Sequence, residues 1–132
     1  MKGSLNHLEM HASQPDVTIP FYKDLLSFFE WQVVAEWPGG LGIGDGNCSL
    51  WFFATPEEHV ESGFNREATG LSHFGIKVDS KDAVDTFYND YMQSKGIEAQ
   101  FETPRARTDF GPSYYQVMFV DPEGLAVEVF CG

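Results

Sequence analysis

Apolar and polar residues alternate along two segments, 4–11 and 71–79, and a period of two is typical of half-buried strands. Each segment is followed by a stretch in which apolar residues recur at helical spacing, at 16–30 and 81–95. Pro20 in the first stretch favours a helix that begins later than residue 16, because proline lacks the N–H group that an interior position needs. The pattern therefore predicts a strand followed by a helix, twice.

Short apolar runs separated by turn-forming residues predict three more strands in each half. Ser80 is a candidate N-cap for the second helix, and Gly96 a candidate C′ glycine at its end. The order βαβββ, twice, predicts an α+β fold of two modules, 1–54 and 71–132, in one domain spanning 1–132 with the polar linker 55–70. The expected strands are 31–36, 41–44, 49–54, 97–102, 114–120 and 125–130.

The two halves also share sequence at a constant offset of 66 residues, without a gap. Self-similarity of this kind indicates a duplicated structural unit. Because the identities fall in one block that opens the same order of elements, we interpret them as a genuine repeat. The identical pairs are Leu5/Leu71, His7/His73, Asp16/Asp82, Phe21/Phe87, Tyr22/Tyr88 and Asp24/Asp90.

Composition narrows the range of functions. The 132 residues carry a formal net charge of −12, which disfavours binding to nucleic acid or to anionic membranes. No apolar run is long enough to span a bilayer, and the N-terminus lacks the apolar stretch of a signal peptide. Cys48 and Cys131 form no disulfide-rich or C-x-x-C pattern, which favours a reducing compartment. We therefore expect a cytoplasmic domain.

The strand pattern places polar side chains together on the face opposite each apolar face. His7 and His73 occupy equivalent positions in the repeat, and Glu128 has the same phase on the last expected strand. Two histidines and one carboxylate with open positions form the facial triad that holds Fe(II) and related divalent ions. The alternative is that these are ordinary surface or hydrogen-bonded residues, and spacing alone leaves both interpretations open.

Four further signatures mark a resemblance to a known family. They are Leu-Asn-His near the start, Phe-Tyr-Lys-Asp-Leu-Leu in the first helix, Gly-Leu-Ser-His at the second half and Asp-Pro-Glu-Gly-Leu-Ala-Val-Glu near the end. The chain resembles the vicinal oxygen chelate superfamily, which includes glyoxalase I, fosfomycin-resistance proteins, bleomycin-binding proteins and extradiol dioxygenases. The likeness covers essentially the whole chain. It specifies the fold but not the reaction, because the family supports unrelated chemistries.

The resemblance implies that His7, His73 and Glu128 are metal ligands, because the family takes its ligands from the first and last strands of each half. The cofactor would be a divalent ion, such as Fe, Mn, Ni or Zn. The resemblance also implies a homodimer with shared sites, in which His7 of one chain meets His73 and Glu128 of the other. The partner molecule would then be a small-molecule substrate.

Departures from the family pattern bear on which of the family's reactions this chain could catalyse. Glyoxalase I has a fourth ligand on the closing strand of its first half, but the residues there are Trp51, Phe52 and Phe53, which cannot ligate a metal. Extradiol dioxygenases use an additional histidine before the second ligand and a tyrosine before the glutamate. His59 precedes His73 by 14 residues, but the position expected for tyrosine is Met118.

Fosfomycin-resistance proteins use an arginine beyond the glutamate, and this chain has none there. Arg105 and Arg107, expected in the loop before the penultimate strand, are candidates to bind an anionic substrate or are simply exposed charges. Trp51, Tyr114 and Met118 are candidates to line the pocket. Glu9 and His11 share a face with His7 and are candidates to orient it or to transfer protons.

We therefore expect a metal-dependent enzyme of the glyoxalase/bleomycin resistance/dioxygenase superfamily that binds a small molecule through two oxygens. The sequence leaves open whether it is a lyase, a dioxygenase or a transferase. The alternative is a non-catalytic small-molecule binding protein of the bleomycin-resistance type. Retention of all three candidate ligands speaks against that alternative, whereas the aromatic content of 15% keeps it under consideration.

Overall fold

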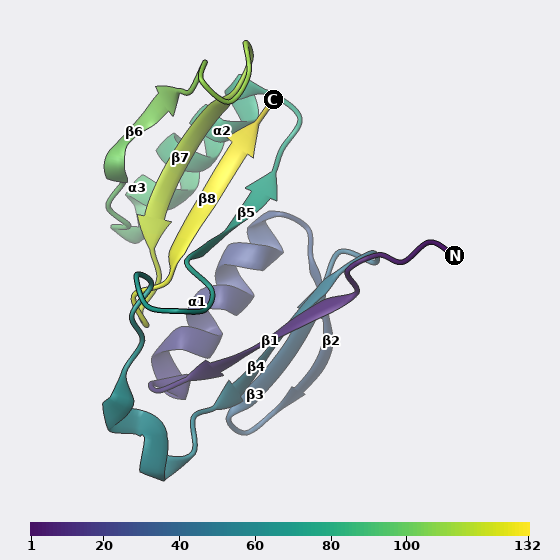
Figure 1. Cartoon of the computed structure of the whole chain (residues 1–132), viewed down its shortest axis with the longest axis vertical. Coiled ribbons are helices and arrows are strands. Elements are labelled where there is room, and N and C mark those ends of the chain that lie inside the picture. The colour runs from purple at the N-terminus through teal and green to yellow at the C-terminus, as the bar shows by residue number, and fades with distance from the viewer. The chain divides into compact units, whose positions relative to one another are not determined.

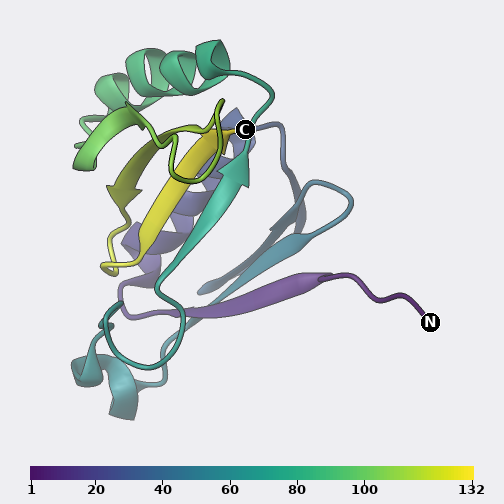
Figure 2. The same ribbon diagram turned by 45° about the horizontal axis from the view of Figure 1, so that its top comes forward.

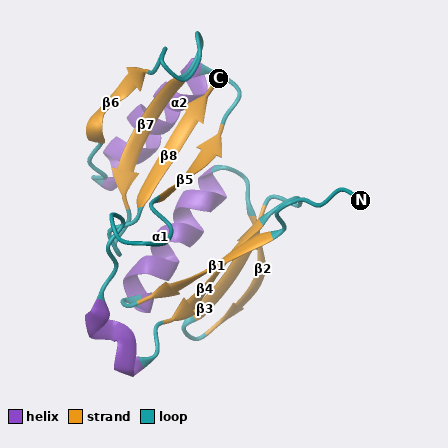
Figure 3. Cartoon of the chain, in the orientation of Figure 1, coloured by secondary structure: helices purple, strands orange, loops and turns teal.

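The computed structural model describes residues 1–132 and divides into two units, Met1–Gly63 and Phe64–Gly132. Each unit consists of a four-stranded mixed sheet with helix on one face, so the chain is an α+β protein of two modules (Figures 1 and 3). None of the helices is both long enough and apolar enough to cross a membrane.

The first unit has its strands in the order β1-β4-β3-β2. Strands β1 and β4 are parallel, and the other neighbours are antiparallel. A short 3₁₀ helix, η1, lies in the connection to the second unit, within the expected linker (Figure 3). The elements are β1 (His7–Ala12), α1 (Pro15–Phe28), β2 (Gln32–Trp37), β3 (Gly40–Gly44), β4 (Ser49–Ala54) and η1 (Glu57–Ser62).

The second unit repeats this topology, with the order β5-β8-β7-β6 and a parallel β5/β8 pair. Its helical segments follow one another without a break and lie along one face of the sheet (Figure 2). The repeat seen in the sequence is therefore also a repeat of topology. The elements are β5 (His73–Lys77), α2 (Lys81–Thr86), the π-helical η2 (Phe87–Met92), α3 (Gln93–Lys95), β6 (Gln100–Ala106), β7 (Tyr115–Val120) and β8 (Ala126–Cys131).

Each unit has its own apolar core between helix and sheet. In the first, Tyr22 of α1 stacks on Phe52 of β4 with ring centroids 4.4 Å apart, and both are buried. In the second, Phe87 of η2 packs on Phe119 of β7 at 5.8 Å. The burial of alternate residues in β1 confirms the predicted assignment of faces.

The ends of the second helical segment follow the prediction. The Ser80 hydroxyl accepts a hydrogen bond from the Ala83 backbone N–H at 3.2 Å, which satisfies one of the free donors of the first turn. Gly96 ends the segment with φ of 67°, in the left-handed conformation that glycine adopts without steric cost.

The prediction for the first helix was partly wrong. Helix α1 begins at Pro15, so Pro20 lies inside it rather than before it. The buried side chains of Ile19, Tyr22 and Leu25 lie on both sides of this proline and hold the helix against the sheet. Tertiary packing therefore outweighs the hydrogen bond that Pro20 cannot donate.

The strand expected at 97–102 lies further along the chain, because β6 spans Gln100–Ala106. Its pairing with β7 is interrupted between Gln100 and Arg105, where Phe101 and Glu102 adopt positive φ values of 57°. Non-glycine residues rarely adopt this conformation, so the sequence pattern did not indicate the irregularity. Arg105 consequently lies within a strand and not in the expected loop.

Candidate functional site

The structure brings two of the three predicted metal ligands together. His73 is the first residue of β5, and Glu128 lies on the neighbouring strand β8, opposite Gly75. Because His73 and Gly75 are two residues apart, His73 and Glu128 project from the same face of the sheet. His73 Nε2 lies 3.6 Å from Glu128 Oε2.

The two side chains differ in their exposure. The Glu128 side chain is only 8% exposed, whereas His73 is 47% exposed. The other carboxylate oxygen of Glu128, Oε1, accepts a hydrogen bond of 2.7 Å from the Tyr114 hydroxyl. Glu128 is thus a buried carboxylate with one oxygen bonded to a tyrosine and the other directed at a histidine.

Tyr114 reaches Glu128 from the loop just before β7. Its ring stacks on Phe130 of β8, with centroids 5.1 Å apart and an interplanar angle of 15°. Burial, and secondly the hydrogen bond to Glu128, raise the pKa of the Tyr114 hydroxyl above its ordinary value. The Tyr114 hydroxyl therefore keeps its proton at neutral pH and donates it in the hydrogen bond to Glu128 Oε1.

The donor set suits a divalent metal ion. Imidazole nitrogen and carboxylate oxygen are ligands of Zn²⁺ and Fe²⁺. Two atoms that each lie about 2.1 Å from one ion are roughly 3.0 to 3.4 Å apart, close to the observed 3.6 Å. This separation exceeds an ordinary N–H···O hydrogen bond, so His73 and Glu128 face each other without closing one.

The first unit carries the third predicted ligand. His7 is the first residue of β1, as His73 is of β5, and it is exposed on the face opposite α1. Its Nδ1 lies 3.0 Å from Asn6 Oδ1. Glu9 and His11 follow at alternate positions of β1 and are exposed on the same face. Within the chain, no group of three or more His, Cys, Asp or Glu side chains lies close enough together to hold a metal ion.

The strand register locates the residue that corresponds to Glu128 in the first unit. Gly75 pairs with Glu128, and its repeat equivalent Glu9 pairs with Trp51. Trp51 therefore occupies in the first unit the position that Glu128 occupies in the second. Its ring lies over Gly42 of β3, where an added Cβ would come within 2.7 Å of it. An indole cannot replace a carboxylate as a metal ligand.

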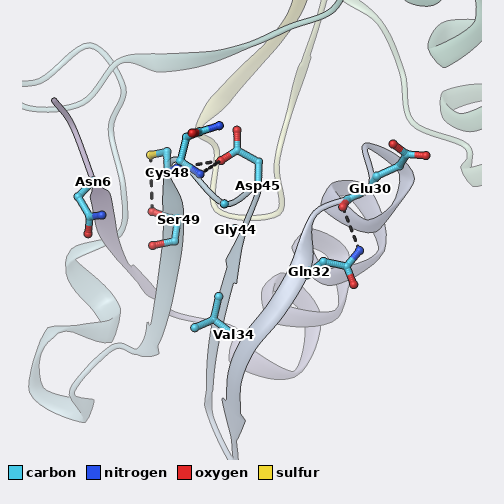
Figure 4. Close-up of a pocket in the computed structure, with 10 residues that line it drawn as sticks. Asn6, Glu30, Gln32, Val34, Gly44, Asp45, Cys48 and Ser49 are labelled. Atoms are coloured by element: carbon cyan, nitrogen blue, oxygen red, sulfur yellow. Dashed lines mark hydrogen bonds between the residues drawn. The ribbon is translucent and has the colours of Figure 1, made fainter.

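The first unit also contains a cavity of about 380 Å³ at the end of its sheet where β1 begins (Figure 4). Ser49, the register partner of His7, contributes to the lining. The turn on one side is closed by Asp45, whose Oδ1 accepts backbone hydrogen bonds from Asn47 and Cys48 at 2.8 Å each. These bonds lower the pKa of the Asp45 carboxyl. The remaining lining residues are Asn6, Glu30, Gln32, Val34, Gly44 and Gly46.

The predicted substrate-binding residues of the second unit have different partners. Met118 of β7 is the register partner of Glu128. Arg107 makes two hydrogen bonds to Asp109, at 2.9 and 2.7 Å, so its charge is already paired. Arg105 donates from Nη1 to Glu102 at 3.1 Å, and its Nε is buried without a partner.

Two features were not anticipated from the sequence. The bond from Tyr114 to Glu128 was missed because Tyr114 lies in a loop rather than at the expected strand position. Gly75 was not recognised as part of the site, although a glycine between His73 and Lys77 in a strand was a signal of close approach. His59, by contrast, lies on η1 and is exposed.

Comparison with known proteins identifies the family. Residues 4–129 match the model of the Glyoxalase/Bleomycin resistance protein/Dioxygenase superfamily, and the chain belongs to this superfamily. A comparison with curated protein sequences found no match.

Solved structures support the same fold. A glyoxalase-type protein from Bacillus halodurans is similar with a TM-score of 0.89 and 25% identity, over 99% of this chain and 97% of that chain. Lactoylglutathione lyase from Agrobacterium tumefaciens has a TM-score of 0.69 and 23% identity, over 99% of this chain and 95% of that chain. A glyoxylase/bleomycin resistance protein/dioxygenase domain from a Frankia species has a TM-score of 0.73 and 16% identity. The match covers 100% of this chain and 99% of that chain.

Proposed function

We propose that this protein is a metal-dependent enzyme that binds a small molecule through two of its oxygen atoms on a divalent ion. The ion would be held by His73, Glu128 and His7. The chain belongs to the superfamily, and we add to this which of its residues would bind the metal.

The observation that carries the proposal is the environment of Glu128. A buried carboxylate is costly unless a cation or several hydrogen bonds compensate its charge. Glu128 has one hydrogen bond from the neutral Tyr114 and faces a histidine at 3.6 Å, whereas the nearby Arg107 is bonded to Asp109. A divalent cation between Glu128 Oε2 and His73 Nε2 would supply the missing positive charge.

His7 is proposed as the third ligand, contributed by the second chain of a homodimer. Two facts favour this choice. His7 is the repeat equivalent of His73, and it lies exposed at the start of β1 on the face opposite the helix. In such a dimer, His7 of each chain would complete the site built on His73 and Glu128 of the other.

When bound, the ion would polarise a carbonyl or stabilise an enolate or catecholate of the substrate, and its open positions would accept two substrate oxygens. The residues of the chain would orient the ligands and limit access of water. Met118 is well located for the second task because it lies directly beside Glu128 in the sheet. On the first unit, Trp51 would form an apolar wall, held by the bond from its Nε1 to Ser49 Oγ at 2.9 Å.

The position of Trp51 bears on the reaction class. Because it stands where a fourth ligand would be, the site would have three protein ligands, which does not favour glyoxalase I chemistry. Dioxygenase, transferase or other lyase reactions are compatible with three ligands and an Fe, Mn, Ni or Zn ion.

A second candidate function is sequestration of a small aromatic molecule without catalysis. It is favoured by the aromatic cluster on the first sheet, where Trp37 lies 6.3 Å from Trp51 and 5.1 Å from Phe53 between ring centroids. Binding of this kind would not depend on a metal ion.

A calorimetric titration distinguishes the two functions. Protein treated with a chelator is titrated with Mn²⁺ or Zn²⁺, and a catechol or a hydroxamate is then added as a bidentate oxygen ligand. The proposal predicts that the ligand binds much more tightly to the metal-loaded protein, and that Glu128→Gln abolishes this difference. Equal binding of an aromatic ligand with and without metal would instead support sequestration.

A further inference from the structure

The hydroxyl of Tyr114 occupies only one of the two oxygens of Glu128. It donates to Oε1 at 2.7 Å, while Oε2 faces His73 Nε2 at 3.6 Å. A carboxylate can ligate a metal through one oxygen or through both, so the state of Oε1 determines which mode is available. We infer that Tyr114 is a positioning residue that leaves Oε2 as the only metal-binding oxygen of Glu128. This inference rests on the proposed function.

Tyr114 is held in place by contacts with its own loop and with β8. Its ring stacks on Phe130 at 5.1 Å, and Phe110 packs edge-on against it at 5.4 Å. Its backbone carbonyl accepts a hydrogen bond from Arg107 N at 2.9 Å. The hydroxyl is therefore supported by a ring stack, an aromatic edge and a backbone bond, and its direction is fixed before any ligand binds.

Gly75 keeps the other side of Glu128 open. A Cβ at this position would lie 3.4 Å from Glu128 Oε2 and 2.9 Å from Phe130 Cε1. The absence of a side chain thus leaves Oε2 accessible on the side that faces His73. Tyr114 restricts one oxygen, and Gly75 leaves the other unobstructed.

The chain offers a matched control in the next residue. Tyr115 also donates its hydroxyl to a carboxylate, Asp85 Oδ1, at 2.9 Å. That carboxylate lies on α2 and is paired with Lys81. Because this bond is made to helix α2 and not to Glu128 or His73, Tyr115→Phe removes a hydrogen bond of the same kind away from the proposed metal site.

The experiment compares Co²⁺ binding by the full-length wild type, Tyr114→Phe and Tyr115→Phe. We expect Tyr114→Phe to lower Co²⁺ affinity by about 10- to 100-fold, the usual effect of losing a hydrogen bond to a metal ligand. We also expect weaker visible absorption, because a second carboxylate oxygen raises the coordination number of Co²⁺. Tyr115→Phe should leave both the affinity and the spectrum unchanged.

Thermal unfolding of the metal-free proteins separates positioning from stability, because both variants lose one hydroxyl bond. If Tyr114→Phe does not fold, Phe130→Leu keeps the hydroxyl but loosens the stack, and it should lower affinity by a smaller factor. A folded Tyr114→Phe with wild-type affinity and spectrum would overturn the role of Tyr114 alone. If the wild type binds no Co²⁺, the proposed metal site is wrong, and this inference is overturned with it.

Discussion

Replacing Gly75 with alanine tests the packing around the candidate site. An added Cβ would lie 2.9 Å from Phe130 Cε1 and 3.3 Å from Phe130 Cδ1. Carbon atoms pack best at about 3.5 to 4.0 Å, so the Phe130 ring must move by roughly half an ångström or more. The ring cannot move freely because it stacks on Tyr114. Gly75→Ala should therefore strain the Phe130–Tyr114 stack.

The size of the effect follows from two opposing contributions. Overpacking costs about 1 to 3 kcal/mol. Replacing glycine by alanine where the backbone is compatible stabilises by about 0.4 to 1 kcal/mol, and Gly75 has no positive φ value. The free energy of unfolding should fall by about 1 kcal/mol, which corresponds to a decrease in Tm of roughly 4 °C.

A double-mutant cycle measured by urea unfolding identifies the source of the strain. Phe130→Leu removes the ring that the new Cβ would meet, so Gly75→Ala should be neutral or slightly stabilising in that background. An equal destabilisation in both backgrounds would refute the reasoning, because the cost would then not arise at Phe130.

Three other predictions concern the dimer, the second helix and the acidic surface. Mixing His7→Ala with His73→Ala protein should restore one of the two metal sites in each mixed dimer, whereas sites built within single chains would show no recovery in a metal-binding assay. Ser80→Ala should lower the free energy of unfolding by about 1 kcal/mol, because the helix loses the hydrogen bond that caps Ala83 N. Ser27→Ala, on the exposed face of α1, should not lower the free energy of unfolding. Equal effects of the two substitutions would contradict the capping role of Ser80. Lys81, and secondly Tyr115, lower the pKa of Asp85 below its ordinary value of 3.8. Its contribution to stability is therefore present above that value and is lost as the pH falls through the lowered pKa. The difference in stability between wild type and Asp85→Asn should shrink below about pH 4 in acid unfolding, and a constant difference would contradict the assignment.

Much of the fold could be predicted because its signals are local. Alternation in β1 and β5 sets which side chains meet the helix, and the repeat places His7 and His73 at the same point of each module. The irregular pairing of β6 could not be predicted, because nothing in the local sequence requires Phe101 and Glu102 to adopt positive φ.

The candidate site was predictable only in part. Strand phase indicated that Glu128 and His73 share a face, and the structure confirms that they are neighbours. The contact from Tyr114 depends on the course of a loop and on a ring stack between residues 16 positions apart, which no periodicity encodes. The role of His7 depends on a contact between the two chains of a dimer and stays a prediction.

The most direct test of the account is the metal content of protein purified without chelator or metal-affinity resin. Wild type should contain about one divalent ion per chain, and His73→Ala should lose it. His59→Ala, which alters an exposed histidine outside the proposed site, should retain it. A metal-free wild type that also fails to take up added Fe²⁺, Mn²⁺, Ni²⁺ or Zn²⁺ would contradict the central claim.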